Sequence, residues 1–368
     1  MRMKKRGQAP NFLRYAAEGI GPGGNSEPVP VFSVSVVVPC LNEAGSIERL
    51  LNAVRAQDAP ILEVIVVDGG STDGTQAILE DYGKKHPDFP LTTLLRPGVT
   101  LPQGINAGVR AARGDVIVRL DAHSHPTLTY VRQCVEALRQ TGAGVVGGVW
   151  ETEAGDSSAT AKAIACAVSH PMGAGDAAYR IGHAGAGRHP IDTVPFGCFR
   201  KSTWENLGGY NEQLLTNEDY EFNYRARLAQ QLVILDSDIR CAYVARATLK
   251  ELAAQYFRYG WWKTKMLKQH PLSLRWRQAV PAGFVAMLVA LACLSVFFSA
   301  ARFALAALVL LYGLALIATA VRMRRRVQSW RIVTILPAAF LTVHLSWGTG
   351  ALVNLLTLGM WPRWKPGS

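Results

Sequence analysis

Short apolar runs alternate with stretches of helical periodicity through the first two thirds of this chain of 368 residues. The apolar runs have the length of buried strands and lie at residues 33–38, 62–67, 91–95, 116–120 and 144–150. Helices are expected between them and after them, at residues 44–57, from a cap at Ser71 or Thr72 onward, and at 102–113, 126–140, 202–207 and 217–230. The alternation predicts an α/β domain with a parallel sheet covered by helices on both faces.

The periodicity weakens before the domain ends. Residues 151–190 are rich in Gly, Ala, Ser and His without a firm period, and they predict a mobile loop with room for one helix. Order returns at residues 193–200, and strands are expected near 232–236 and 240–244. We therefore place the α/β domain at residues 31–245, after a flexible basic segment at residues 1–30.

The last part of the chain is uniformly apolar. Residues 279–299 and 303–321 carry no charged side chain, and the uncharged run 332–360 contains only His344 as an ionisable group. With a rise of about 1.5 Å per residue, each run is long enough to cross a hydrocarbon core of about 30 Å. We expect transmembrane helices at about 279–299, 303–321 and 332–358, of which the third either crosses the bilayer or re-enters it.

Charge and composition indicate a membrane rather than a nucleic acid as the partner. The net charge is +12 and the pI about 9.6, yet the mean hydropathy is +0.12, whereas nucleic-acid-binding chains usually carry their charge on a polar sequence. Basic residues are interleaved with aromatic ones at 246–278, which predicts amphipathic helices at the lipid headgroups.

The arrangement of charge also predicts the compartment. The basic stretch 322–326, between the second and third apolar runs, marks a cytoplasmic loop, and the α/β domain then faces the cytoplasm as well. Six cysteines without a CxxC pair fit a reducing compartment. We expect a multi-pass protein of the inner (cytoplasmic) membrane.

Acidic and polar side chains follow the predicted strands. Asn42 and Glu43 come after the first strand, Asp68 ends the second, and Asp121 and His123 end the fourth. Ligands of open α/β sheets bind at the carboxyl edge where such residues meet. Asp121 and His123 could share a divalent cation, either Mg²⁺ or Mn²⁺, with imidazole favouring Mn²⁺.

Two further acidic residues and three alternatives complete this picture. Glu218 and Asp219 begin a late helix, and Asp219 could accept a proton from an attacking hydroxyl. Asp68 could bind a nucleobase or ribose, or only cap the following helix. Glu218 could simply favour a helix N-terminus, as acidic residues do. His125, His170, His183 and His189 are interpreted as loop histidines rather than third metal ligands.

Ordered motifs make the chain resemble a known family. Residues 34–43 (VSVVVPCLNE) and 66–75 (VVDGGSTDGT) are similar to the first two motifs of family 2 glycosyltransferases. Residues 120–123 (LDAH) stand where that family has its Asp-x-Asp metal motif, and Glu218-Asp219 matches its late acidic pair. With residues 255–260 (QYFRYG) and the apolar tail, the chain most resembles the succinoglycan-type exopolysaccharide glycosyltransferases.

The resemblance implies a GT-A fold, a nucleotide-sugar donor and inversion at the anomeric carbon. By position it implies that a UDP-sugar is framed by donor-binding residues at the sheet edge: Pro39, Asn42, Glu43, Asp68 and Asp121. It implies that Asp121 and His123 hold the metal–diphosphate, and that Asp219, with Glu218 beside it, is the catalytic base.

The chain departs from the family pattern at two positions. Gly69 replaces the second Asp of the Asp-Asp-Gly-Ser motif, and His123 replaces the second metal-motif Asp. The Gln-x-x-Arg-Trp motif of processive polymerases is missing, which favours a single sugar addition. The leading hypothesis is transfer of glucose from UDP-glucose to a polyprenyl-diphosphate-linked saccharide, with other polysaccharide-assembly proteins as further partners. The alternatives are transfer to a polyprenyl phosphate, or a non-catalytic membrane assembly protein with a decayed donor site.

Overall fold

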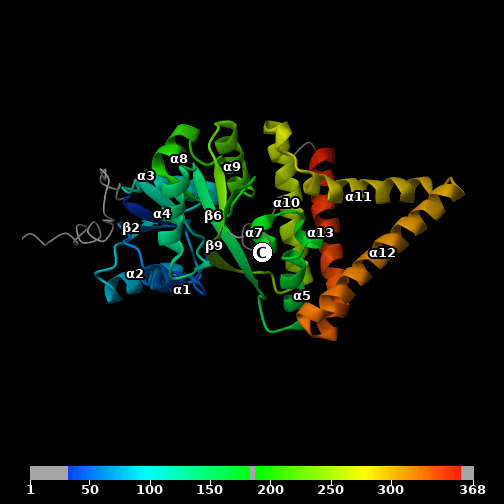
Figure 1. Ribbon diagram of the computed structural model, residues 1–368, viewed down its shortest axis with the longest axis horizontal. Helices are drawn as coiled ribbons and strands as arrows, with labels where there is room; N and C mark the ends of the chain where they lie inside the picture. Colours follow the sequence, from blue (N-terminus) through cyan, green and yellow to red (C-terminus); the bar gives the residue numbers. More distant parts are fainter. Residues whose placement is uncertain (1–31, 183–186, 358–368) are drawn as a thin grey trace, which may run out of the picture. The chain divides into compact units, whose positions relative to one another are not determined.

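The computed structural model describes residues 32–182 and 187–357, and one mixed β-sheet runs through its α/β part (Figure 1). Within these residues the strand order is β3-β2-β1-β4-β8-β6-β9-β5, and β7 also pairs with β9. The strands are β1 (Val34–Cys40), β2 (Glu63–Asp68), β3 (Leu91–Leu95), β4 (Val116–Arg119), β5 (His125–Pro126), β6 (Val145–Glu153), β7 (Arg188–Pro190), β8 (Cys198–Arg200) and β9 (Val233–Val244).

The first four strands are parallel, as the sequence predicts. β1 pairs with β2 and with β4, and β2 pairs with β3, all in parallel register. Every residue of β1, β2 and β4 is buried. Successive side chains of a strand point to opposite faces, so complete burial means that both faces of the sheet are covered.

The rest of the sheet is not parallel, and here the expectation of a parallel sheet throughout is wrong. β8 runs antiparallel to both β4 and β6, and β5 and β7 run antiparallel to β9. β6 and β9 are parallel, and β9 is one strand rather than the two expected. The pairing register of β6 with β9 shifts between Gly147 and Val149 of β6. This irregularity allows β9 to continue through residues 237–239, which separate the two expected strands.

Most helices of the α/β domain begin and end within a few residues of the sequence-based expectation. They are α1 (Ile47–Arg55), α2 (Thr75–Lys85), α3 (Leu101–Ala111), α4 (Tyr130–Thr141), α8 (Lys201–Leu207) and α9 (Glu218–Leu228). The expected cap of α2 is wrong, because the helix begins at Thr75 after Gly74. Ser71 and Thr72 instead join two loops, as described below. An apolar core lies between the sheet and α3, α8 and α9.

Residues 151–190 hold more regular structure than expected. The prediction of a loop with one helix is wrong for the described part, which contains α5 (Ala159–Val168), α6 (Pro171–Ala174) and α7 (Ala178–Ile181). α5 packs against the C-terminal helix α13, and both belong to one apolar cluster. Alanine is a strong helix former, so this stretch folds as a helix without an amphipathic period.

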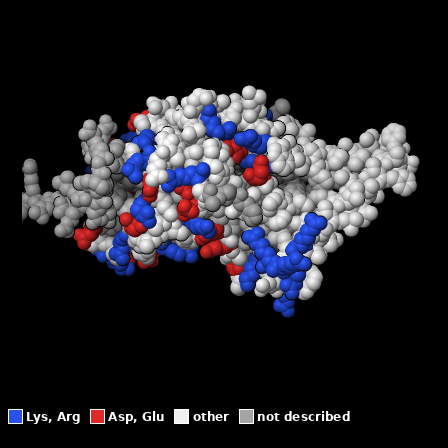
Figure 2. All heavy atoms as spheres, viewed as in Figure 1, with Lys and Arg blue, Asp and Glu red and all other residues white. Residues whose placement is uncertain are grey.

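The C-terminal helices are α10 (Leu249–Gln269), α11 (Trp276–Leu294), α12 (Ser299–Val327) and α13 (Trp330–Leu356), with a 3₁₀ turn at Pro271–Ser273. α11, α12 and α13 are each long and apolar enough to cross a membrane. Figure 2 shows α11 and α12 largely without charge, whereas basic residues gather where α12 ends, at Arg322, Arg324, Arg325 and Arg326. The expected flexible segment 1–30 and the end of the third apolar run lie outside the described residues.

α10 packs along α13 instead of standing alone. Its buried residues include Tyr256, Trp261 and Trp262. Some of the aromatic residues of α10 therefore pack in the protein interior, and only the others remain at the surface. A Cβ on Gly260 would collide with the backbone carbonyl of Trp347, and one on Gly350 with that of Phe257. The two helices therefore approach so closely that only glycine fits at these two positions.

Candidate functional site

Three strand ends and one helix start meet at the carboxyl edge of the sheet. Cys40, the last residue of β1, is the Cα partner of Asp68, the last residue of β2. Asp121 and His123 follow β4, which lies on the other side of β1. α9 brings Glu218 and Asp219 to the same place. The parallel pairing of these strands therefore brings the predicted residues together.

Arg119 connects the acidic residues of this edge. Its side chain is only 1% exposed, and Nη2 lies 2.8 Å from Oδ1 of Asp121 and 3.2 Å from Oε1 of Glu218. Nη1 contacts the carboxylate of Asp219. Arg119 was not among the site residues predicted from the sequence, although a charged residue at the end of an apolar strand, two positions before Asp121, is a visible signal.

Burial changes the acid–base properties of the late pair. Burial raises the pKa of Glu218 and that of Asp219, and the attraction of Arg119 only partly opposes the shift. Asp121 adds its negative charge and raises both further. The side chain of Asp219 is 20% exposed and that of Glu218 is 9% exposed, so Asp219 is the more accessible of the two bases.

The loops after β1 and β2 hold each other in place. The backbone N–H of Asn42 donates to Ser71 Oγ (2.8 Å), and the side-chain oxygen of Asn42 accepts from Thr72 N–H (2.9 Å). The N–H of Glu43 donates to Thr75 Oγ1 (2.9 Å). Asn42 adopts a positive φ of 57°, which asparagine tolerates better than most residues. Through these contacts, residues 71–75 (STDGT) support the loop that follows β1.

Asp68 has one satisfied and one unsatisfied oxygen. Its Oδ1 accepts from the N–H groups of Gly70 and Ser71, both at 2.7 Å. Its Oδ2 is buried and has no hydrogen-bond partner among the described residues. A buried acceptor without a partner is costly, so this oxygen is suited to a donor group of a ligand. Pro39 lies nearby within β1, opposite Val67.

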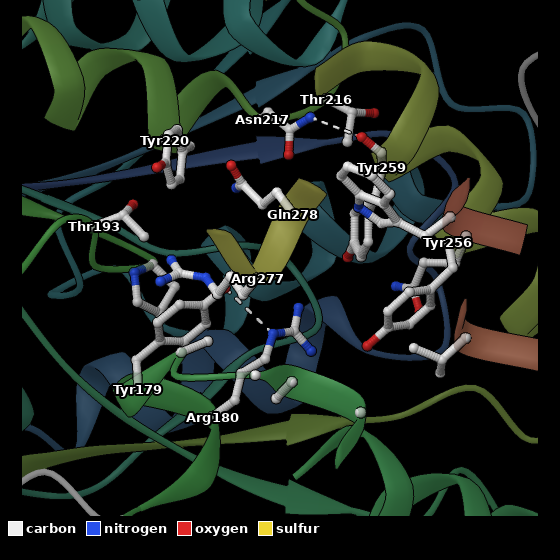
Figure 3. Close-up of a pocket in the computed structure, with 18 of the residues that line it drawn as sticks. Tyr179, Arg180, Thr193, Thr216, Asn217, Tyr220, Tyr256, Tyr259, Arg277 and Gln278 are labelled. Carbon is white, nitrogen blue, oxygen red and sulfur yellow. Dashed lines mark hydrogen bonds between the residues drawn. The ribbon is translucent and has the colours of Figure 1, made fainter. Parts of the chain in front are cut away.

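A cavity of about 740 Å³ opens beside the acidic edge (Figure 3). The residues of the acidic edge that line it are Arg119, Asp121, His123, Glu218 and Asp219. Its other walls come from α6, α7 and α10 and from the apolar helices α11, α12 and α13, including Phe284, Tyr312 and Trp347. Pro39, Asn42, Glu43 and Asp68 are not among the residues that line this cavity. The cavity thus joins the charged edge to the helices that are long enough to span a membrane.

Comparison with known proteins identifies the family. Residues 35–198 match the sequence model described as glycosyl transferase family 2. The succinoglycan biosynthesis protein ExoA of Rhizobium meliloti (strain 1021) is 32% identical over 249 residues, which is 67% of this chain and 73% of that protein. The chain belongs to glycosyltransferase family 2.

Two further comparisons extend over more of this glycosyltransferase. A Methanococcus voltae protein, named dolichyl N-acetyl-alpha-D-glucosaminyl phosphate 3-beta-D-2,3-diacetamido-2,3-dideoxy-beta-D-glucuronosyltransferase, is 25% identical over 70% of this chain and 80% of its own length. The mannosyltransferase PcManGT of Pyrobaculum calidifontis, solved with GDP-Man and Mn²⁺, is 20% identical, with a TM-score of 0.59 over 87% of this chain and 88% of that one. The GT-A fold is confirmed by this likeness.

The metal-motif residues of this glycosyltransferase offer two donors to a cation. Nδ1 of His123 lies 2.9 Å from Oε1 of Glu43, so a proton on Nδ1 leaves Nε2 available. Oδ1 of Asp121 is bound by Arg119, which leaves Oδ2. In the described part of the chain no group of three or more His, Cys, Asp or Glu could hold a metal. Two protein donors fit an ion that completes its coordination with phosphate oxygens and water.

The other histidines lie elsewhere in the glycosyltransferase. His125 is in β5, His170 caps α6 and His189 is in β7, while His183 lies outside the described residues. His344 of α13 pairs with Tyr312 of α12 at 2.7 Å, and its Nε2 lies 2.7 Å from the carbonyl oxygen of Met172. These contacts pair His344 with a neighbouring apolar helix, which satisfies a polar side chain in an apolar segment.

Proposed function

We propose that this glycosyltransferase transfers one glucose from UDP-glucose to a saccharide carried on a polyprenyl diphosphate, with inversion at the anomeric carbon. The observation that carries the proposal is the cavity of about 740 Å³, whose lining combines the carboxylates of Asp121, Glu218 and Asp219 with side chains of three apolar helices. An acceptor with a sugar head and a lipid tail has chemistry that matches both kinds of lining.

The donor side is assigned to the carboxyl ends of β1, β2 and β4. The free Oδ2 of Asp68 would accept a hydrogen bond from the uracil or the ribose, next to the loop that contains Pro39, Asn42 and Glu43. Asp121 and His123 would hold the divalent cation together with the diphosphate. Mn²⁺ or Mg²⁺ there would neutralise the charge of the leaving UDP. The presence of Mn²⁺ in the PcManGT complex supports a divalent cation.

The acceptor side is assigned to Asp219. Its carboxylate takes the proton of an acceptor hydroxyl while the hydroxyl oxygen bonds to the anomeric carbon. The bond from that carbon to the UDP oxygen breaks on the opposite face, and the electron pair leaves with UDP. The accessibility of Asp219 supports this role, whereas Glu218 is more buried and holds Arg119 in position.

The relatives support a lipid-linked acceptor and a role in exopolysaccharide biosynthesis. ExoA is named for succinoglycan biosynthesis, and the Methanococcus voltae relative is named for transfer to a dolichyl N-acetyl-alpha-D-glucosaminyl phosphate. We place the chain in the inner membrane with α11, α12 and α13 as spans and the catalytic domain in the cytoplasm. The basic residues at the end of α12 support this orientation. Other polysaccharide-assembly proteins would then be its partners, with no role for nucleic acid.

The test is sugar transfer in membranes that contain the protein. Membranes are incubated with labelled UDP-glucose, UDP-galactose or GDP-mannose, each with Mn²⁺ or Mg²⁺, and the lipids are extracted and analysed by mass spectrometry. We expect a diphosphate-linked saccharide heavier by one hexose from UDP-glucose, and none from membranes with Asp219→Asn. A labelled polyprenyl monophosphate would show transfer to the lipid phosphate instead. Absence of both product and UDP binding would refute an enzymatic role.

A further inference from the structure

Arg180 is a mostly buried cation with aromatic neighbours and no carboxylate. It lies on α7 and points into the cavity, with the ring of Tyr256 beside it (Figure 3). Its guanidinium carbon is 4.6 Å from the ring centroid of Trp150 and 5.7 Å from that of Tyr243. Nε donates a 3.2 Å hydrogen bond to the hydroxyl of Tyr179. Among the described residues, no carboxylate forms an ion pair with it.

Within residues 32–182 and 187–357, no carboxylate therefore neutralises the charge of Arg180. An arginine keeps its proton at any physiological pH, and withdrawing a charge from water costs several kcal/mol, of which a cation–π contact returns about 2. A guanidinium has five N–H donors, and the contacts described above use one of them. The side chain lines the cavity, so a ligand that enters there can reach the remaining donors. A guanidinium whose N–H donors face a cavity is suited to binding an anion.

The neighbouring arginines strengthen the positive field on this side of the cavity. Arg246 and Arg258 also line it, and neither forms an ion pair with a carboxylate of the described chain. Burial and the nearby charge of Arg246 lower the pKa of Arg258, as expected where cations gather without an anion. By contrast, Arg119 contacts three carboxylates and Arg277 pairs with Asp176 and Asp192.

Residues 256–260 of α10 lie beside Arg180 and contact both α9 and α13. Tyr256 and Tyr259 are among the groups that surround the guanidinium. The carbonyl oxygen of Tyr259 accepts a 3.3 Å hydrogen bond from Asn217, the residue before Glu218, and Gly260 lies against Trp347 of α13. Arg180 is thus adjacent to a helical turn that touches the catalytic helix on one side and an apolar helix on the other.

We infer that Arg180 binds the phosphate groups that join the acceptor saccharide to its lipid. The inference rests on the proposed function, because it assumes an acceptor with its sugar at Asp219 and its lipid at α11, α12 and α13. The linking phosphates of such a molecule lie between its sugar and its lipid, and Arg180 lines the same cavity beside the α10 turn that contacts both α9 and α13. The planar fork of a guanidinium matches the oxygens of a phosphate in a bidentate manner, which a lysine cannot reproduce.

The test measures binding of soluble polyprenyl analogues to the full-length protein in phosphatidylcholine nanodiscs. Calorimetric titrations compare farnesyl diphosphate, farnesol and UDP. We expect Arg180→Gln to weaken farnesyl diphosphate binding by about 10- to 100-fold and to leave farnesol and UDP binding unchanged. Arg180→Lys, which keeps the charge, should give an intermediate loss. Arg139→Gln, at an exposed position near the end of α4, is the matched control and should change nothing.

Several results would overturn the inference. The first is an unchanged affinity of Arg180→Gln for farnesyl diphosphate, provided that the variant still binds UDP. Retained UDP binding shows that the variant is folded. Equal losses of farnesyl diphosphate and UDP binding would assign the residue to the donor diphosphate. If phosphatidylglycerol in the nanodiscs competes with farnesyl diphosphate only when Arg180 is present, the anion is a phospholipid headgroup. Failure of sugar transfer from every nucleotide sugar would refute the proposed function. It would leave the farnesyl diphosphate result unchanged, so a failure of the proposed function can be distinguished from a failure of the Arg180 inference.

Discussion

Replacing Arg119 by methionine tests the electrostatics of the acidic edge. The side chain is buried and contacts three carboxylates, those of Asp121, Glu218 and Asp219. Methionine keeps much of the volume but leaves three acidic groups facing one another in a shielded site. Removing one partner of a buried ion pair costs about 3–5 kcal/mol, and we expect Arg119→Met to lose at least that much at about pH 8.

The loss should shrink as the pH falls. Without the cation, burial and mutual repulsion raise the pKa of Glu218 and that of Asp219 further above their values in the unfolded chain. An acid whose folded-state pKa is raised destabilises the fold progressively as the pH rises from the unfolded value, about 4, through the folded value. Below both values it is protonated in either state and costs nothing. Each unit of pKa is about 1.36 kcal/mol, so a two-unit rise on one carboxylate accounts for about 2.7 kcal/mol.

The assay is thermal unfolding of the detergent-solubilised protein, followed by tryptophan fluorescence in metal-free buffer at about pH 8 and about pH 5.5. At 2–4 °C per kcal/mol, the expected loss in apparent Tm is on the order of 10 °C at the higher pH and clearly smaller at the lower one. Arg132→Met is the control, because this arginine pairs with Asp58 at 2.9 Å but is 49% exposed, where such pairs contribute about 0–1 kcal/mol. Equal losses at both pH values, or a loss as small as that of the control, would refute the reasoning.

Three further predictions concern catalysis, the metal and the packing of α10. Asp219→Asn should lower transfer about 100- to 10,000-fold with UDP affinity retained. Because burial raises the pKa of this base, wild-type transfer should decline as the pH falls through the raised value, and a flat pH profile would contradict its role. Glu43→Gln, which disturbs the partner of His123, should weaken Mn²⁺-dependent UDP binding about 10- to 100-fold, and unchanged binding would separate Glu43 from the metal. Gly350→Ala should cost about 1–3 kcal/mol in thermal unfolding, whereas Gly313→Ala, with open space around it, should not destabilise.

The parts of the fold that depend on local pattern could be predicted from the sequence. The buried runs of β1, β2 and β4 are apolar along their whole length, and Asp68 and Asp121 follow two of them directly. The parallel pairing then brings these residues to one edge without further information. The likeness of the motifs to family 2 glycosyltransferases gave the family, which the comparisons confirm.

Features that depend on distant partners could not be predicted in this way. Arg119 is visible as a charge at the end of a strand, but its partner Glu218 is 99 residues away. The alanine-rich α5 has no polar face because it lies against α13, and period alone cannot distinguish such a helix from a loop. β8 is a short strand that runs antiparallel to its neighbours. Its direction depends on the path of the chain through α5, α6 and α7 before it returns to the sheet, and not on the residues of β8 itself.

The docking of α10 on α13 links the membrane part of the chain to its chemistry. The sequence shows α10 as a basic helix with aromatic residues, whereas the structure uses part of that aromatic face to pack against an apolar helix. Nε2 of His344 can only donate to the carbonyl oxygen of Met172, so its Nδ1 must accept from the hydroxyl of Tyr312. These two bonds join α13, α12 and the segment before α7 around one cavity. The apolar wall of the cavity and the segment that carries Arg180 are therefore held together. A displacement of α13 would alter this part of the cavity while leaving Asp68 in place.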